Sequence, residues 1–502
     1  MKKSLFLGAS LLMLACACNQ TPTAVQEELN PVLTIEGGKI VGVTNQDSTV
    51  LIYKGIPYAA APVGELRWKK PQPVTPWDSV KVADTFGDAS FQFDKNPNDG
   101  EYGTEFYPEN PTYSEDCLYL NVWTPKGAPG DTTKKLPVAM WIHGGGYNVG
   151  WGYEMTMDGE AWAKRDVILV TINYRLGMAG FMNHALLSAE DNGHSGNYGT
   201  YDQIAALTWI KNNIAQFGGD PENITVFGQS AGAGSVKNMI SSPLSKGMVK
   251  QAIIQSCGGI GNRMMEQTQP QEQLDAPATK KLKDAGFDTL EKLRAASLKE
   301  LIEALPFWTE PDAVRFGPHT DSVVLPEDFT TAVMNNHVAD IPYMMGHCAD
   351  DMPGMEAGEL RFAEVRDSLS QHPTYLYLFN RPLPTDGRPS LKGSFHSSEL
   401  WYMFGTLDRS WRPFTEGDHK LSNEMVDAWT NFCKYGNPNG AEAGKWAPST
   451  KEAPFVYEFK VEDNFFSVLC SFTVRSLFDV SSLNLRSGFA LPLLLERRLS
   501  NV

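Results

Sequence analysis

The sequence lacks the short patterns that usually hold metals, nucleotides or disulfide frameworks. Its 502 residues contain no Cys-x-x-Cys pair, no His-Glu-x-x-His, no P-loop and no glycine-rich dinucleotide fingerprint. Five of the seven cysteines are scattered through the body of the chain, at Cys117, Cys257, Cys348, Cys433 and Cys470. This spacing indicates neither a disulfide framework nor a zinc site. We therefore expect no metal and no organic cofactor, and we interpret these cysteines as buried apolar thiols.

Positive charge is also scarce. Lys and Arg number 43 against 59 Asp and Glu, so the net charge is -16 and the isoelectric point is about 5.1. Because binding to phosphates needs a basic face, this balance argues against nucleic acid as a partner. No apolar run in the body of the chain reaches the roughly 18 to 20 residues that span a bilayer. With 42% hydrophobic residues, the chain can bury a large core, as one domain with insertions or as two domains.

The first 18 residues differ in kind from the rest. Lys2 and Lys3 precede an apolar run at residues 5–14, which is followed by Ala15-Cys16-Ala17-Cys18. This pattern resembles a bacterial lipoprotein signal, with Cys18 or Cys16 carrying the lipid; the alternative is an ordinary secretory signal cleaved near Ala17. The polar residues 19–33 then form a flexible tether. We expect export to the bacterial cell envelope, with the protein anchored to the membrane through this cysteine, or secretion.

One stretch predicts a strand, a sharp turn and a helix. An apolar run from residue 224 ends in Gly228-Gln-Ser-Ala-Gly232, and small, helix-compatible residues follow at 233–240. The two glycines let the backbone bend tightly, so that Ser230 stands at the apex above the N-terminus of the helix. Chance matches to Gly-x-Ser-x-Gly are common in a glycine-rich chain, so a plain serine turn is equally compatible with this motif alone.

A second glycine-rich stretch follows another predicted strand. Residues 136–142 are apolar and end in His143-Gly-Gly-Gly-Tyr147. Consecutive glycines leave backbone N–H groups open to approach, which suits an oxyanion in a serine hydrolase. A tight turn would use the same residues.

The order of the predicted elements indicates an α/β fold. Strands are predicted at residues 34–40, 49–56, 116–124, 136–142, 166–172, 252–255, 341–345 and 375–379, and helices at 202–217, 290–305 and 423–435. The alternation through the middle of the chain predicts a doubly wound, mostly parallel sheet, with chemistry at the carboxyl ends of its strands. Residues 91–113 are expected to be a long irregular excursion, and residues 267–305 a helical insertion over the active-site face.

Several motifs together resemble the type-B carboxylesterase/cholinesterase family. They are Gly55-Ile-Pro-Tyr-Ala, Gly64-Glu-Leu-Arg67, Ser114-Glu-Asp-Cys-Leu-Tyr-Leu-Asn121, His143-Gly-Gly-Gly146, Asn173-Tyr-Arg-Leu-Gly177, Gly196-Asn-Tyr-Gly-Thr-Tyr-Asp202, Phe217-Gly-Gly-Asp-Pro221 and Gly228-Gln-Ser-Ala-Gly232. They occur in register from about residue 37 to residue 464. The resemblance implies an α/β-hydrolase domain at residues 34–466 that cleaves small-molecule esters through an acyl-serine. Residues 467–502 have no counterpart in the family.

The resemblance also implies roles for individual residues. Ser230 is the nucleophile and His396 the general base, and the amides of Gly145, Gly146 and Ala231 form the oxyanion hole. The third catalytic residue of the family, the carboxylate that pairs with the histidine, is usually a Glu. In this sequence the matching stretch is Gly346-His-Cys-Ala-Asp-Asp-Met, and Asp351 stands at the Glu position. Asp350 is the alternative candidate for this carboxylate. The order Ser, Asp, His along the chain is that of α/β-hydrolases.

Two departures from the family pattern bear on function. Cys117 stands where the family often has one half of a disulfide. Its partner would lie at residues 86–92, which contain no cysteine, so we predict that no disulfide holds the aromatic loop at residues 91–113. This loop also lacks tryptophan, so an aromatic site for a quaternary ammonium is not supported. The competing hypotheses are a non-catalytic, neuroligin-like binding module and a lipase, lactonase or peptidase on the same fold.

Overall fold

The computed structural model describes residues 30–92, 100–107, 111–261, 269–305, 313–441 and 444–461. The predicted signal at residues 1–18, the lipid attachment at Cys16 or Cys18 and the tail at residues 467–502 lie outside these ranges and stay predictions. Within the described ranges, none of the helices combines the length and the apolar character needed to cross a membrane.

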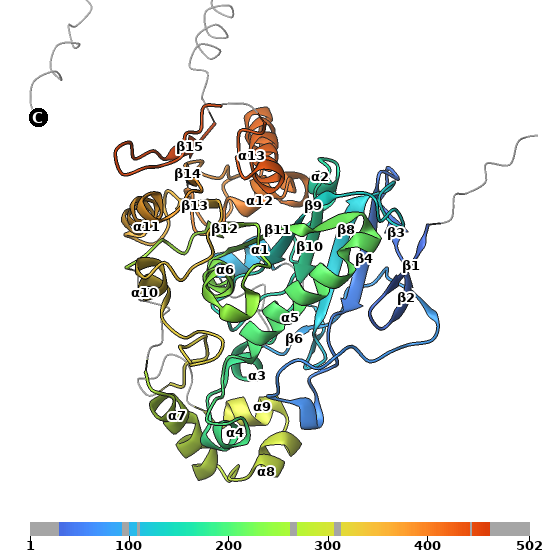
Figure 1. Ribbon diagram of the computed structural model, residues 1–502, viewed down its shortest axis with the longest axis vertical. Helices are drawn as coiled ribbons and strands as arrows, with labels where there is room; N and C mark the ends of the chain where they lie inside the picture. The colour runs from blue at the N-terminus through green and yellow to red at the C-terminus, as the bar shows by residue number, and fades with distance from the viewer. Residues whose placement is uncertain are drawn as a thin grey trace, which may run out of the picture.

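A ten-stranded sheet forms the centre of the molecule (Figure 1). Its strands are β3 (Val43–Thr44), β4 (Val50–Pro57), β8 (Tyr119–Pro125), β9 (Leu136–Ile142), β10 (Ile168–Ile172), β11 (Gly219–Gln229), β12 (Gln251–Gln255), β13 (Tyr343–Cys348), β14 (Thr374–Phe379) and β15 (Tyr457–Phe459). They lie in the order β15-β14-β13-β12-β11-β9-β10-β8-β4-β3. The strands from β15 to β10 are parallel, and β8, β4 and β3 continue the sheet antiparallel. The predicted doubly wound, mostly parallel sheet is confirmed.

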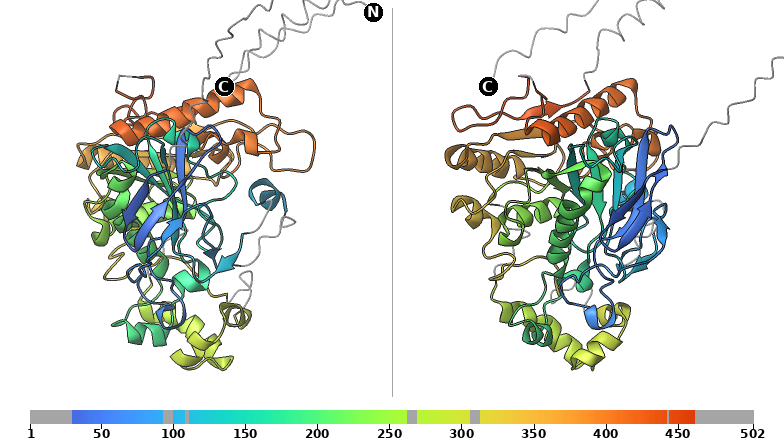
Figure 2. Two further views of the ribbon diagram at one scale, coloured as in Figure 1. Left: turned by 90° about the vertical axis from the view of Figure 1, so that its right-hand side faces the viewer. Right: turned by 45° about the vertical axis from the view of Figure 1, so that its right-hand side comes forward.

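Helices cover both faces of this sheet. They are α1 (Gly100–Phe106), α2 (Glu160–Ala163), α3 (Gly177–Phe181), α4 (Ala185–Glu190), α5 (Tyr198–Asn213), α6 (Ala231–Ser241), α7 (Gln271–Asp284), α8 (Leu290–Ala295), α9 (Leu298–Glu303), α10 (Phe329–Met334), α11 (Met355–Leu369), α12 (Leu400–Met403) and α13 (Glu416–Tyr435). Short 3-10 turns are η1 (Gly64–Leu66), η2 (Ile214–Phe217), η3 (Pro243–Ser245) and η4 (Leu407–Arg409). Figure 2 shows α7, α8 and α9 gathered at the end of the molecule opposite α13.

Alternating side chains along the central strands build two cores. On β11, Val226 packs into the cluster shared with α5, α6, α10 and α11. Its neighbour Phe227 faces the other side, where Trp141 and Trp162 lie against it and α2, α12 and α13 pack. Because both faces are buried, the central strands read as unbroken apolar runs in the sequence.

The structure corrects several predicted elements. The tether predicted at residues 19–33 overlaps the first strand, β1 (Val32–Ile35), and the helix predicted at residues 290–305 is interrupted at Ala296 and Ser297, between α8 and α9. Residues 34–40 are not one strand: they contain the turn of a hairpin between β1 (Val32–Ile35) and β2 (Gly38–Val41). Gly37 has φ of 94° in this turn, a conformation that suits glycine, and β5 (Val80–Val82) extends the small sheet. The excursion at residues 91–113 is not wholly irregular, because its described part contains α1 and part of the pairing of β6 (Ala89–Ser90) with β7 (Tyr113–Ser114).

The helical insertion docks away from the centre of the sheet. Leu282 of α7, Leu293 of α8 and Leu301 of α9 are fully buried in one cluster with residues of α3 and α4. The described part of α7 to α9 does not contribute to the lining of the pocket whose wall includes Gly234, four residues after Ser230.

A buried ion pair attaches the loop after β10 to α5. The guanidinium of Arg175 donates to both oxygens of Asp202, at 2.8 and 2.7 Å, and the Arg175 amide donates to the same carboxylate at 3.0 Å. Both side chains are almost fully buried, with 2% and 0% exposure. This pair fixes the segment that carries the Asn173-Tyr-Arg-Leu-Gly177 motif.

We expect Asp202→Ala to lower the free energy of unfolding by about 3–5 kcal/mol, because it leaves Arg175 as an unpaired buried cation. Urea unfolding followed by tryptophan fluorescence measures the change. The control is Glu364→Ala, which breaks an exposed ion pair with Arg361 and should cost at most about 1 kcal/mol. Equal losses in the two variants would contradict the structural role assigned to the buried pair.

Candidate active site

Ser230 occupies the turn between β11 and α6 in a strained conformation. Its φ and ψ are 58° and -126°, a combination that costs a non-glycine residue on the order of 1–3 kcal/mol. The Ser230 amide donates to the carbonyl of Gln255 at 2.9 Å. A Cβ atom on Gly232 would lie 2.0 Å from the carbonyl oxygen of Ile142, so only glycine permits this approach of α6 to β9. The flanking glycine of the motif therefore has a steric cause.

The glycine loop after β9 lies directly against this turn. A Cβ atom on Gly144 would be 3.1 Å from Cβ of Ser230. Gly145 and Gly146 have φ of 101° and 62°, and a Cβ atom on Gly145 would meet the carbonyl oxygen of Val149 at 1.9 Å. Ala231 is the first residue of α6, so its N–H has no acceptor within the helix. The predicted oxyanion-hole residues thus come from two segments that meet beside Ser230.

The two candidate acids have different partners. The imidazole Nδ1 of His396 lies 2.8 Å from Oδ1 of Asp351, whose side chain is 1% exposed. Asp350 instead accepts a hydrogen bond from the Ser394 amide at 2.8 Å, and its backbone forms an isolated bridge with Phe395. The structure therefore brings Asp351 to the imidazole, while Asp350 holds the backbone of the loop that carries His396.

The other ring nitrogen of His396 faces the turn that carries Ser230. With Nδ1 protonated toward Asp351, Nε2 is the acceptor, and the side-chain amide of Gln229 donates to it at 3.2 Å. A hydrogen bond from the Ser230 hydroxyl to His396 is not among those of the described residues, although Ser230 is the next residue after Gln229. Catalytic hydrogen bonds are often made only once substrate is bound. Gln229 was part of the motif, but its sequence context carries no signal for this contact.

Buried acids set the charge state of the imidazole. Burial lowers the pKa of His396, but the hydrogen bond and charge of Asp351 and the charge of Glu399 outweigh it, so the pKa lies above its usual 6.5. For Asp351, burial raises the pKa, but the hydrogen bond and charge of His396 lower it by more, so the pKa lies below its usual value. Each partner therefore favours the charged form of the other.

Glu399 is a functional candidate for which the sequence supplied no role. It is fully buried, and burial raises its pKa. The Cys348 thiol donates to Glu399 Oε2 at 2.8 Å, and the Ser256 hydroxyl donates to Oε1 at 3.4 Å. Cys348 is thus buried as predicted but is a hydrogen-bond donor to an acid rather than a purely apolar thiol. The spacing of Glu399, three residues after His396, was the only available signal.

Helix α1 is fastened to the histidine loop by polar contacts. The hydroxyl groups of Tyr102 and Ser397 lie 2.8 Å apart, next to His396. Glu105 forms a fully buried ion pair with Arg412 at 2.8 Å and accepts a hydrogen bond from the Trp401 indole at 3.1 Å. Cys117 is a free, buried thiol, which agrees with the prediction that no disulfide holds the aromatic loop. Within the described ranges, groupings of His, Cys, Asp and Glu that could hold a metal ion are absent.

The chain is similar to known esterases over most of its length. Residues 29–365 and 355–472 match the Carboxylesterase family. The para-nitrobenzyl esterase of Bacillus subtilis is 32% identical over 83% of this chain and 92% of its own length, and the fumonisin B1 esterase of Sphingopyxis macrogoltabida is 32% identical over 85% and 86%. The solved structure of a thermophilic PNB esterase superposes with a TM-score of 0.72 at 30% identity, covering 86% of this chain and 96% of that one.

A carboxylesterase of Geobacillus stearothermophilus, Est55, is similarly close. Its structure gives a TM-score of 0.70 at 31% identity and covers 88% of this chain and 99% of its own. These relatives are matched over nearly their whole length, so the likeness covers the complete catalytic fold rather than a fragment. The chain belongs to the carboxylesterase family, has the α/β-hydrolase fold and is a carboxylic ester hydrolase of type B.

Proposed function

We propose that this protein hydrolyses small-molecule carboxylic esters through an acyl-enzyme on Ser230, with His396 as general base and Asp351 as its carboxylate partner. The observation that carries the proposal is the 2.8 Å contact between His396 Nδ1 and Asp351 Oδ1. It leaves Nε2 unprotonated and turned toward the nucleophile turn. A carboxylate on the far nitrogen fixes this tautomer and stabilises the imidazolium that forms during reaction.

The first step forms the acyl-enzyme. Ser230 Oγ attacks the ester carbonyl carbon while its proton passes to His396 Nε2, for which the Gln229 amide must give up its contact with that atom. The carbonyl oxygen gains negative charge, and the amides of Gly145, Gly146 and Ala231 donate to it. When the tetrahedral intermediate collapses, the bond to the leaving oxygen breaks and His396 returns the proton to the alcohol.

The second step releases the acid. Water takes the place of the alcohol and gives its proton to His396, while its oxygen attacks the acyl carbon. The second tetrahedral intermediate collapses with cleavage of the bond to Ser230, which recovers its proton. The net reaction consumes one ester and one water and yields one carboxylic acid and one alcohol.

We expect Asp351→Asn to lower kcat for p-nitrophenyl butyrate by roughly 10⁴-fold, because the wrong imidazole tautomer then faces Ser230. The pH profile adds a second readout. The wild-type kcat/KM requires neutral His396, so it falls as the pH decreases through a pKa above 6.5. In the variant, burial still lowers this pKa while the Asp351 charge is gone, so the acid limb moves to lower pH.

Asp350→Asn is the matched control, because an amide oxygen can still accept from the Ser394 amide. Its kcat should stay within about threefold of wild type, and Ser230→Ala gives the background rate. A severe loss in Asp350→Asn with a mild one in Asp351→Asn would overturn the assignment of the acid.

The glycine loop provides an independent test. Gly145→Ala should reduce kcat/KM by at least about 10²-fold, since the new Cβ would collide with Val149 and displace an oxyanion donor. Gly247→Ala is the control: Gly247 also has a positive φ, of 77°, but a Cβ there meets nothing within 4 Å. It carries similar backbone strain without the collision, so activity should change by less than about threefold. Comparable losses in both variants would point to backbone strain alone.

A further inference from the structure

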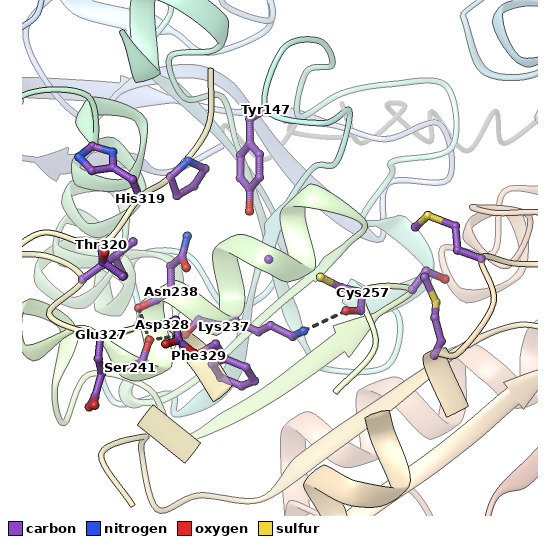
Figure 3. Close-up of a pocket in the computed structure, with 16 residues that line it drawn as sticks. Tyr147, Lys237, Asn238, Ser241, Cys257, His319, Thr320, Glu327, Asp328 and Phe329 are labelled. Carbon is purple, nitrogen blue, oxygen red and sulfur yellow. Dashed lines mark hydrogen bonds between the residues drawn. The ribbon is translucent and has the colours of Figure 1, made fainter. Parts of the chain in front are cut away.

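A pocket runs along α6 from Gly234 to Ser241 (Figure 3). Gly234, one helical turn after Ser230, forms part of its wall together with Tyr147. Ser256, which contacts Glu399, and Met352, which follows Asp351, line it on the side of the buried acids. Because this wall begins one helical turn after Ser230, one of the two groups of an ester bound at Ser230 can point toward this end of the pocket.

The pocket contains a buried lysine. Lys237 lies on α6 with 6% exposure, and Figure 3 shows its side chain extending toward Cys257. Its ammonium donates to the carbonyl oxygens of Cys257 and Gly259, both at 2.9 Å. An ammonium has three N–H donors. The third has no oxygen acceptor among the described residues, and the ring of Phe329 lies 5.1 Å from Nζ.

The acids in the pocket wall are engaged elsewhere. Asp328 accepts from the amide and the hydroxyl of Thr331 as the N-cap of α10, and Glu327 accepts from His337 and Asn335. The described residues contain no ion pair between Lys237 and a carboxylate.

Behind the wall, one further acid influences the charge of the pocket. The Glu359 carboxylate lies 2.9 Å from His347 Nδ1. Burial raises the pKa of Glu359, and the charges of His347 and Lys237 offset that rise only in part. Lys237 is thus the charged group of the pocket that keeps an unused donor.

Burial of an ammonium that is bound only by neutral carbonyl oxygens costs solvation free energy, and an anion that binds to it offsets this cost. We propose that Lys237 makes this pocket a subsite for a carboxylate at the far end of the substrate's acyl chain, so that half-esters of dicarboxylic acids are preferred substrates. This inference rests on the function proposed above. Hydrolysis would consume one water and release a dicarboxylate, an alcohol and one proton, with the far carboxylate unchanged.

The spacing sets the length of the preferred acyl chain. Lys237 follows Ser230 by seven residues, which is about 10 Å along a helix at 1.5 Å per residue. A chain of about four methylene groups between ester carbon and carboxylate, as in adipate, suits this distance.

The test compares two methyl esters with the same four-methylene chain, monomethyl adipate and methyl hexanoate, by titration of the acid released. Wild-type kcat/KM should be at least tenfold higher for monomethyl adipate. In Lys237→Met, the value for monomethyl adipate should fall at least tenfold, while that for methyl hexanoate changes by less than threefold. Lys246→Met removes an equal charge from an exposed position beyond the end of α6, and it should leave the wild-type preference intact.

Each other outcome counts against the proposal. Equal losses for both esters in Lys237→Met would make Lys237 a structural residue, and a wild-type preference for methyl hexanoate would exclude the carboxylate subsite. If Lys237→Met does not fold, as judged by circular dichroism, the wild-type ratio alone decides. A wild-type protein that hydrolyses neither these esters nor p-nitrophenyl butyrate would refute the proposed function itself, which separates the two failures.

Discussion

The active site depends on one close approach, that of the N-terminus of α6 to the end of β9. The missing Cβ of Gly232 allows this approach, because any side chain there would lie 2.0 Å from the Ile142 carbonyl. Ser230 stands at the same place with a positive φ of 58°, and the glycine loop comes within reach of its Cβ. The surrounding structure holds Ser230 in this strained conformation, because β11 lies in the middle of a parallel sheet that is buried on both faces.

The remaining parts of the site are held by long-range polar contacts. The loop that carries His396 is attached through Asp350 to the end of β13 and through Ser397 to α1, which the buried pair of Glu105 and Arg412 fixes in turn. Asp351 and Glu399 then bias the imidazole toward its charged form from two sides. In water such a bias would be weak, whereas the buried position of these groups strengthens each charge interaction.

The parts of the fold and of the site that could be predicted are those with a local sequence motif. Ser230 and the glycine loop could be found because each carries its structural cause within a few residues, and the unbroken apolar runs of β9 to β11 predicted the parallel sheet. Sequence favoured Asp351 over Asp350 only through its position in the family motif, because no local pattern shows which of two adjacent carboxylates at a strand end faces the imidazole. Gln229, Glu399 and Lys237 gained their interest only from contacts with distant segments, which periodicity and spacing do not encode.

The most direct test of the central claim is the reaction of the protein with a fluorophosphonate, which traps an activated serine as a stable adduct. Intact-mass spectrometry gives the number of adducts per chain, and peptide mapping gives their position. The account predicts one adduct, on Ser230, with loss of p-nitrophenyl butyrate hydrolysis in proportion to labelling. An adduct on another serine such as Ser235 or Ser256, or full activity in the labelled protein, would contradict it.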